Sequence, residues 1–332
     1  MATIKDIANK LGISISTVSK GLNGASDVSS ELRQVILDTA VEMGYTTKRM
    51  KKEEHKKLCI FVENMDYVSP NHFGYDIVLG FKQAAYRDNW NVTVLPITPE
   101  FQKQEKYDTY MLKMGYSGAF LVGLSLHDEW MQQLENTSIP TVLFDNYIKK
   151  NHHVAYIGTD SVEGIDAAIE NLVQLGHTKI ACLNGDLDSM ISEQRQHAFY
   201  KCMEAHNMSI YPELIAHGPY ASTSAHEFVP SFLKAGATAI CCGSDLIAYG
   251  VMEECAHLGY RVPEDVSVIG FDDLPASANT NPPLTTIRQD RIELGKSGYM
   301  ALLSLMNRVS VSRTLLRPEF ILRNSTAKVV DR

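Results

Sequence analysis

Three carboxylates stand directly after short apolar runs of the sequence. Asp145 follows Thr-Val-Leu-Phe, Asp245 follows Ala-Ile-Cys-Cys-Gly-Ser, and Asp272 follows Val-Ser-Val-Ile-Gly-Phe. Arg195 lies in Ser192-Glu-Gln-Arg195, where a helix is expected to open. Carboxylates and a guanidinium form paired hydrogen bonds with vicinal hydroxyls, and Tyr220 offers an aromatic ring that can stack on a sugar face. The set suits a sugar-like ligand, although each residue alone is more often a helix cap or a surface charge.

A second polar set lies near the N-terminus. Ser16, Thr17, Ser19 and Lys20 are expected on the outward face of a short helix, and short hydroxyls with a lysine suit base edges and phosphates in a major groove. The apolar residues Ile15, Val18 and Leu22 recur at the helical period.

Three helices are predicted to position this second set. Thr3 followed by Asp6 indicates an N-cap before a helix over residues 4–11, and Gly12 ends that helix. Ser14 caps the second helix, which Asn23-Gly24 ends; Ser29 or Ser30 starts a third helix that Gly44 closes. Two helices joined by a tight turn and braced by a third are typical of a helix-turn-helix, while a small three-helix bundle that binds protein is the alternative.

The charge distribution supports a nucleic-acid partner for the N-terminal part only. The 332-residue chain has a formal net charge of -8. Residues 1–57 contain ten Lys/Arg against seven Asp/Glu, a net +3, whereas the remainder has 21 against 32, a net -11. This asymmetry is expected when a small polyanion-binding module is joined to an acidic body.

Several protein classes are disfavoured by motif and composition. No apolar run approaches the roughly 18 residues that span a bilayer, and no signal-peptide pattern follows Met1, so a cytoplasmic location is expected. The cysteines form no C-x-x-C pair and are expected to be reduced and inert. No H-E-x-x-H, Walker or dinucleotide-binding motif occurs, so neither metal nor cofactor is expected and a sugar-converting enzyme is disfavoured. The cysteines are Cys59, Cys182, Cys202, Cys241, Cys242 and Cys255.

The residues after 57 alternate between short apolar runs and amphipathic stretches. Apolar runs at 58–62, 92–95, 118–122 and 141–144 are separated by amphipathic stretches at 75–89, 104–114 and 128–136, and the alternation restarts after residue 157. This pattern predicts two doubly wound parallel-sheet lobes with helices on both faces, and a ligand at the carboxyl ends of the strands.

The N-terminal residues closely resemble the DNA-binding headpiece of LacI/GalR-family bacterial regulators. The matching runs are Thr3-Ile-Lys-Asp-Ile-Ala, Leu11-Gly-Ile-Ser-Ile-Ser-Thr-Val-Ser-Lys20, Leu22-Asn-Gly24, Val28-Ser29 and Met43-Gly-Tyr45. The resemblance implies DNA contacts from Thr3, Ser14, Ile15, Ser16, Thr17, Ser19, Lys20 and Asn23.

The linker departs from that family. Where the family has a hinge helix ending in a leucine that wedges into the minor groove, this chain has Glu53 and Glu54 among basic residues. Met50 as an apolar contact and a basic tether that neutralises phosphates are both open interpretations. The tether adds Lys48, Arg49, Lys51 and Lys52 to the expected DNA contacts. The expected domains are a headpiece over 1–47, a linker over 48–57 and an effector-binding and dimerisation body over 58–332.

The body resembles the same family, whose core is similar to periplasmic sugar-binding proteins. Its matching runs include Gly176-His-Thr-Lys-Ile180, Cys242-Gly-Ser-Asp245, Val262-Pro-Glu-Asp-Val-Ser-Val-Ile-Gly-Phe-Asp-Asp273 and Pro282-Pro-Leu-Thr-Thr-Ile287. The resemblance implies effector contacts from Asp145, Arg195, Tyr220, Asp245 and Asp272, with Phe73 and Tyr75 in the loop after the first strand. No leucine-heptad tail is present, so a dimer rather than a tetramer is expected.

These features together predict a homodimeric transcriptional regulator that acts as a repressor. Its headpieces are expected to bind the two halves of a palindromic operator, and a small sugar between the lobes is expected to control operator affinity. Induction and co-repression are both compatible with the sequence. A cytoplasmic sugar-binding protein without a regulatory role is the alternative.

Overall fold

The computed structural model describes residues 2–45 and 56–329, and the chain divides into two compact units. Unit 1 contains Met1–Met65, Gly80–Tyr156 and Gly295–Thr314, and unit 2 contains Asp66–Leu79, Ile157–Leu294 and Leu315–Arg332. The linker residues for which a DNA contact is expected, together with Met50, Glu53 and Glu54, lie outside the described ranges.

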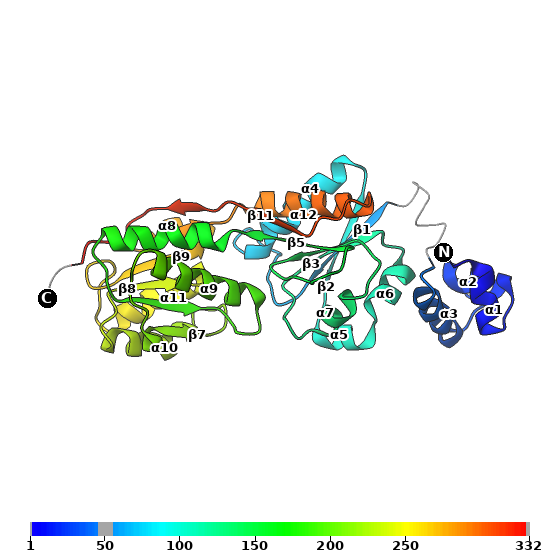
Figure 1. Ribbon diagram of the computed structural model, residues 1–332, viewed down its shortest axis with the longest axis horizontal. Coiled ribbons are helices and arrows are strands. Elements are labelled where there is room, and N and C mark those ends of the chain that lie inside the picture. Colours follow the sequence, from blue (N-terminus) through cyan, green and yellow to red (C-terminus); the bar gives the residue numbers. More distant parts are fainter. Residues whose placement is uncertain (1, 46–55, 330–332) are drawn as a thin grey trace. The chain divides into compact units, whose positions relative to one another are not determined.

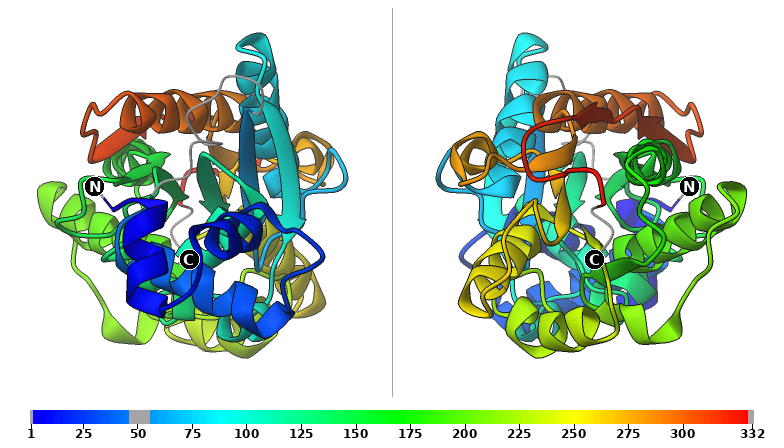
Figure 2. Two further views of the ribbon diagram at one scale, coloured as in Figure 1. Left: turned by 90° about the vertical axis from the view of Figure 1, so that its right-hand side faces the viewer. Right: turned by 90° about the vertical axis from the view of Figure 1, so that its left-hand side faces the viewer.

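The headpiece consists of the three helices that its capping residues predict. They are α1 (Ile4–Leu11), α2 (Ile15–Asn23) and α3 (Ser30–Glu42), shown in blue in Figures 1 and 2. Thr3 and Asp6 form a capping box at α1, Ser14 caps α2, and Ser29 rather than Ser30 caps α3. Gly12 and Gly24 end the first two helices in the left-handed conformation, at φ 66° and 74°, which glycine adopts without a steric penalty.

Unit 1 contains a six-stranded sheet in the order β11-β5-β4-β3-β1-β2. The helices α5, α6 and α7 cover one face, where Phe61, Tyr107 and Trp130 form an aromatic cluster. On the other face, Phe81 of α4 stacks on Phe120 of β3 and meets Tyr299 of α12 edge-on. The elements are β1 (Lys57–Val62), α4 (Phe73–Arg87), β2 (Asn91–Pro96), α5 (Pro99–Gln104), α6 (Tyr107–Met114), β3 (Gly118–Val122), α7 (Glu129–Leu134), β4 (Thr141–Phe144), β5 (Val154–Thr159), α12 (Arg291–Met306) and β11 (Arg313–Leu316).

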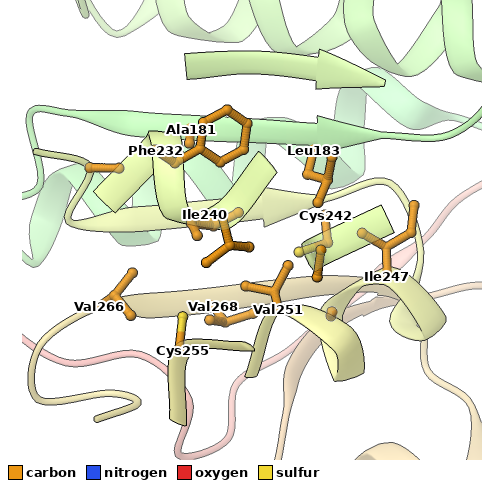
Figure 3. Close-up of a cluster of buried hydrophobic side chains, with 14 of the residues drawn as sticks. Ala181, Leu183, Phe232, Ile240, Cys242, Ile247, Val251, Cys255, Val266 and Val268 are labelled. Carbon is orange, nitrogen blue, oxygen red and sulfur yellow. The ribbon is translucent and has the colours of Figure 1, made fainter. Parts of the chain in front are cut away.

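Unit 2 repeats this organisation with a sheet in the order β12-β10-β9-β8-β6-β7. Along β6, Ile180 and Cys182 pack with residues of helices α8 and α9. Ala181 and Leu183 pack with residues of α10 and α11 on the other face (Figure 3). The apolar run is therefore buried on both faces, as expected for a parallel strand between two helical layers. The elements are α8 (Ser161–Gln174), β6 (Ile180–Asn184), α9 (Met190–Ala205), η3 (Pro212–Leu214), β7 (Ile215–His217), α10 (Ser224–Lys234), β8 (Ala239–Cys242), α11 (Asp245–His257), β9 (Ser267–Asp272), η4 (Pro275–Asn279), β10 (Thr285–Arg288) and β12 (Glu319–Ile321).

The structure corrects three expectations about the elements. The amphipathic stretch expected over 104–114 is part of two helices, because Glu105 between them is extended at φ -117°. The sequence pattern does not predict strands β7, β10 and β11, since all three are short and lack a continuous apolar run. The C-terminal strand β12 pairs antiparallel with β10, so the sheet of unit 2 is not purely parallel.

The cysteines are reduced and mostly buried in the structure. All six cysteines are free thiols, five of them buried, and burial raises the pKa of Cys182 and of Cys255 to about 12. Such thiols are poor nucleophiles near neutral pH. Within residues 2–45 and 56–329, no helix is long and apolar enough to cross a membrane, and no group of His, Cys, Asp and Glu side chains is placed to hold a metal ion.

Candidate DNA-binding and effector sites

Helix α2 buries one side in the headpiece and exposes the other. Val18 is fully buried in the headpiece core, and the Cα of Gly21 packs so closely on Ile36 that a Cβ added there would lie 2.6 Å from Ile36 Cδ1. Ser16 and Lys20 are exposed, and Ile15 keeps 52% of its surface exposed. The exposed face therefore presents a hydroxyl, an ammonium group and an apolar side chain, which suits contact with base edges and a thymine methyl.

The other polar residues of this surface are held by local hydrogen bonds. Ser14 Oγ accepts from the Thr17 backbone N–H at 3.0 Å and lies 2.8 Å from the Thr17 hydroxyl. Asn23 Nδ2 donates to the Ser19 carbonyl at 2.8 Å, and Thr17 and Ser19 are half-buried. The Thr3 hydroxyl donates to the Asp6 carboxylate at 2.7 Å, and this bond lowers the pKa of Asp6. These residues are therefore pre-positioned, with Thr3 engaged as a helix cap.

Lys20 forms an exposed ion pair with Asp27. This contact lowers the pKa of Asp27, with the hydrogen bond from Lys20 as its largest cause. Exposed pairs contribute little stability, so exchanging Asp27 for a phosphate or a base costs little. The pair leaves Lys20 available as a DNA contact.

In unit 2, two polar residues and a glycine lie at the carboxyl ends of parallel strands. Asn184 ends β6, Gly243 follows β8, and Asp272 ends β9. The strand order reverses between β6 and β8, which is the switch point at which doubly wound sheets bind ligands.

Arg195 is buried at this edge of the sheet. Its guanidinium carbon lies 3.9 Å above the centre of the Phe271 ring, and Nη1 donates to the Gly243 carbonyl. Nη2 lies 3.9 Å from Asp272 Oδ1. The Arg195 Nε is buried without a hydrogen-bond acceptor among the described residues. A buried donor of this kind is costly, and a ligand oxygen can satisfy it.

Asp272 occupies a strained backbone conformation beside Arg195. Its φ is 121°, and Asp273 follows at φ 52°. Conformations of this kind cost about 1 to 3 kcal/mol in a non-glycine residue and persist only where the surroundings enforce them. Gln289 Nε2 donates to Asp272 Oδ1 at 2.7 Å, and Arg291 Nη1 donates to the Asp272 carbonyl at 3.1 Å. The carboxylate is thus fixed from both its side chain and its backbone.

Tyr220 lies against the loop that follows β6. Its ring covers Gly185 so closely that a Cβ at Gly185 would lie 2.0 Å from Tyr220 Cζ. The Tyr220 hydroxyl lies 2.8 Å from the Ser192 hydroxyl, and Asn184 Nδ2 donates to the Ser192 carbonyl at 2.6 Å. The ring position is therefore set by a glycine and by the first turn of α9, the helix that also positions Arg195.

Asp245, the third expected carboxylate of this set, forms hydrogen bonds inside unit 2. The residue has no exposed surface, and its carboxylate accepts from the Leu274 backbone at 2.8 Å and from the Ser277 and Thr286 hydroxyls. Ser244, not Asp245, caps α11. Burial, with the charge of Asp272 as the next cause, raises the pKa of Asp245 to about 7. Both carboxylate oxygens of Asp245 therefore have hydrogen-bond partners inside unit 2.

The remaining expected effector residues are divided between the units. Phe73 and Tyr75 were expected in a loop, but they lie in the first turn of α4. Both belong to unit 2, which includes Asp66–Leu79. Asp145 follows β4 in unit 1 and has a positive φ of 53°. Arg195, Tyr220, Asp245 and Asp272 all belong to unit 2.

Two polar residues of this edge were missed at the level of sequence. Asn184 ends one strand, and Gln289 directly follows another. A polar residue after an apolar run is the criterion that indicates Asp272, and it also selects Asn184 when amides are considered along with charges. Gln289 was missed because the short run before it, Thr285–Arg288, does not stand out as a strand.

Unit 1 also contains a buried strand-end carboxyl, Glu63, directly after β1. Gln102 Nε2 donates to its Oε2, and Gln102 Oε1 accepts from the Trp130 backbone N–H at 3.0 Å. Burial is the largest cause, and the charge of Asp128 the next, of a pKa raised to about 8. The carboxyl is therefore mostly protonated in the folded protein at neutral pH.

We expect Glu63→Gln to stabilise the protein at alkaline pH. A folded-state pKa above the unfolded value means that the wild type loses stability as pH rises from about 4.5 to about 8. The neutral amide avoids this loss, so its gain should grow across that window to the order of 2 kcal/mol above pH 8 and vanish near pH 4.5. Thermal unfolding between pH 4.5 and 9 measures it, with Glu253→Gln as the control, because Glu253 is exposed and does not contribute to the pKa of Glu63. A gain in stability for Glu63→Gln that does not change with pH would contradict a raised pKa of Glu63.

Comparison with known proteins places both parts of the chain. Residues 3–48 match the family of bacterial regulatory proteins, lacI family, and residues 169–326 match the periplasmic binding protein-like domain. The HTH-type transcriptional repressor PurR of Aliivibrio salmonicida (strain LFI1238) is 28% identical over 334 residues, covering 99% of this chain and 100% of that protein. PurR of Pasteurella multocida (strain Pm70) is 28% identical and covers 98% of each.

Solved structures show the same arrangement of elements. A lac repressor dimer bound to operator and the anti-inducer ONPF has a TM-score of 0.70 at 25% identity, covering 98% of this chain and 99% of that chain. A complex of the transcriptional regulator CelR with cellobiose has a TM-score of 0.74 at 22% identity, covering 98% and 100%, and shows similarity of fold. The relatives are named as transcriptional repressors and not as enzymes. With its helix-turn-helix headpiece and periplasmic-binding-protein-like body, this chain belongs to the LacI/GalR family of DNA-binding transcriptional regulators.

Proposed function

We propose that this protein is a cytoplasmic, homodimeric repressor whose affinity for a palindromic operator is controlled by a small sugar or sugar derivative. The observation that most supports it is that one chain has both an exposed polar face on α2 and a strained, buried carboxylate beside Arg195 in unit 2. The proposed domains are the headpiece over 1–47, the linker over 48–57 and the effector-binding and dimerisation body over 58–332.

The proposed DNA contacts are the exposed residues Ile15, Ser16 and Lys20 of α2, together with the Ser14 and Thr17 hydroxyls at the start of that helix. A palindromic operator is proposed because a dimer presents two recognition helices related by two-fold symmetry. The lac repressor relative was solved as a dimer bound to operator, which supports this proposal. A sugar-binding protein without a regulatory role is disfavoured by the complete match of the headpiece.

The proposed effector contacts are Asp272, Arg195 and Tyr220, with Asp145, Phe73 and Tyr75 as further candidates. A carboxylate and a guanidinium 3.9 Å apart can share adjacent hydroxyls of one sugar ring. The CelR relative was solved with cellobiose, which supports a saccharide class. By linkage, effector and operator must change each other's affinity by the same factor, and the sign depends on which conformation the sugar prefers.

We expect Ser16→Ala and Lys20→Ala each to weaken operator binding without lowering thermal stability. Both side chains are exposed, so their removal leaves the headpiece core unchanged. Losing one base contact costs about 1 to 3 kcal/mol. Fluorescence anisotropy on an operator selected from a random duplex pool measures the loss. Lys10→Ala, which removes another exposed lysine that pairs with Glu42 in the same headpiece, is the matched control. Wild-type affinity in either variant would remove that residue from the recognition face.

A thermal-shift screen of mono- and disaccharides tests the effector class. A ligand present at 100 times its dissociation constant stabilises the native state by about 2.7 kcal/mol. Cellobiose, glucose, galactose and ribose are the first probes, and a positive sugar should also change operator affinity. A panel in which no saccharide shifts the unfolding temperature would reject the saccharide class while leaving DNA recognition in place.

A further inference from the structure

Gln289 connects the proposed effector carboxylate to a strand that belongs to both units. Its Nε2 donates to Asp272 Oδ1 at 2.7 Å, and its Oε1 accepts from the Thr159 hydroxyl at 2.6 Å. Both the donor and the acceptor of one amide group are thereby used. Thr159, Gln289 and Asp272 are only 2%, 3% and 6% exposed, so water does not compete for these bonds.

The positions of Thr159 and Gln289 in the chain are informative. Thr159 ends β5, and the chain passes from unit 1 to unit 2 within that strand, after Tyr156. Gln289 lies just before α12, and the chain passes back to unit 1 within that helix, after Leu294. One hydrogen-bonded chain, Thr159–Gln289–Asp272, therefore joins two crossing segments to the carboxylate.

Arg291 holds the same strand end through the backbone. Its Nη1 donates to the carbonyls of Asp272 and Asp273 at 3.1 and 3.2 Å, and its Nη2 pairs with Asp76 at 3.0 Å. Asp76 belongs to α4, where the chain changes units after Leu79. A third crossing segment is thus tied to the backbone of Asp272, independently of its side chain.

We propose that Gln289 is a positioning residue that transmits the state of the Asp272 carboxylate to the crossing segments at Thr159 and Gln289. The proposal rests on the proposed function only in that Asp272 is an effector contact. A change in hydrogen bonding at the carboxylate alters the strength of its bond from Gln289 and, through the same amide, the bond from Thr159. The crossing segments then respond to a change at the carboxylate without being in direct contact with the ligand.

Amide hydrogen exchange of the full chain tests this proposal without an effector. Asp272→Asn removes the charge while keeping the side-chain size, and asparagine tolerates a positive φ. We expect the amides of residues 157–161 and 288–294 to exchange at least about fivefold faster in this variant, the lower end of typical site-to-site coupling. In Gln289→Met or Thr159→Val backgrounds, the same substitution should change their exchange by less than about twofold.

The matched control is Gln102→Met in unit 1. Gln102 is also a buried glutamine whose amide bonds two partners, Glu63 and the Trp130 backbone. In this background Asp272→Asn should keep its full effect on residues 157–161 and 288–294. The proposal is overturned if Asp272→Asn leaves these amides unchanged, or if its effect is the same with and without Gln289, as additivity requires of uncoupled sites. Failure of every saccharide in the thermal-shift screen would instead reject only the effector class.

Discussion

Asp272→Ala is expected to abolish the effect of sugar on operator binding while leaving operator affinity itself intact. A carboxylate that accepts two sugar hydroxyls loses two charge-assisted hydrogen bonds, each contributing about 1.5 to 3 kcal/mol. The expected loss of effector affinity is therefore about 100-fold or more. The substitution also leaves the buried Arg195 guanidinium without its nearest carboxylate, which weakens the rest of the site.

The measurement is a saccharide titration of the operator complex, using the sugar that gives the largest thermal shift. Asp272→Asn is tested alongside, because alanine at φ 121° adds backbone strain that asparagine tolerates better. Asp273→Asn is the matched control: it is the adjacent carboxylate, but it pairs with Arg288 and Arg323. The control should keep its sugar response. Effector-dependent release by Asp272→Ala equal to that of the wild type would refute the proposed site.

Asp245→Ala is expected to destabilise the protein rather than to impair sugar recognition specifically. The substitution leaves the Leu274 N–H and the Ser277 and Thr286 hydroxyls without their acceptor in a fully buried position. Each unsatisfied buried donor costs about 1 to 3 kcal/mol, so a total of about 4 kcal/mol is expected. For a domain of this size, that corresponds to a fall in unfolding temperature of roughly 10 °C.

Urea unfolding followed by circular dichroism measures this loss, with Asp245→Asn and Ser244→Ala as comparisons. The asparagine keeps one acceptor oxygen and should recover part of the stability. Ser244→Ala removes only the N-cap of α11 and should cost about 1 kcal/mol. If Asp245→Ala unfolded like the wild type but failed to bind sugar, the structural role would be wrong and the original expectation of a ligand contact would stand.

The same amino-acid type at the end of a strand therefore serves two different purposes. Asp245 and Asp272 both follow apolar runs, and their sequence neighbourhoods favour neither role. The Asp245 carboxylate packs against β9 at Gly270. A Cβ at Gly270 would lie 2.2 Å from Asp245 Oδ1, so this position must be a glycine to leave room for the carboxylate. Asp272 instead lies at the sheet edge beside Arg195.

The sequence alone determined the features that depend on nearby residues. The caps Thr3, Ser14 and Ser29 and the glycines after the first two helices defined the headpiece, because capping bonds reach only three residues along the chain. The alternation of apolar runs and amphipathic stretches predicts the doubly wound sheets, because the period of apolar residues is also a local property of the sequence. The resemblance to the LacI/GalR family followed from these short, local motifs.

Which polar residues are bonded internally depends instead on the tertiary structure. The partners of Asp245 are 29, 32 and 41 residues away, and Thr159 lies 130 residues from Gln289. Such pairs leave no periodic signal in one sequence, because their contact depends on the strand order of the folded sheet. Phe73 and Tyr75, which are expected in a loop, lie instead in the first turn of α4. Burial and long-range hydrogen bonding, not residue type, therefore assign the roles in this site.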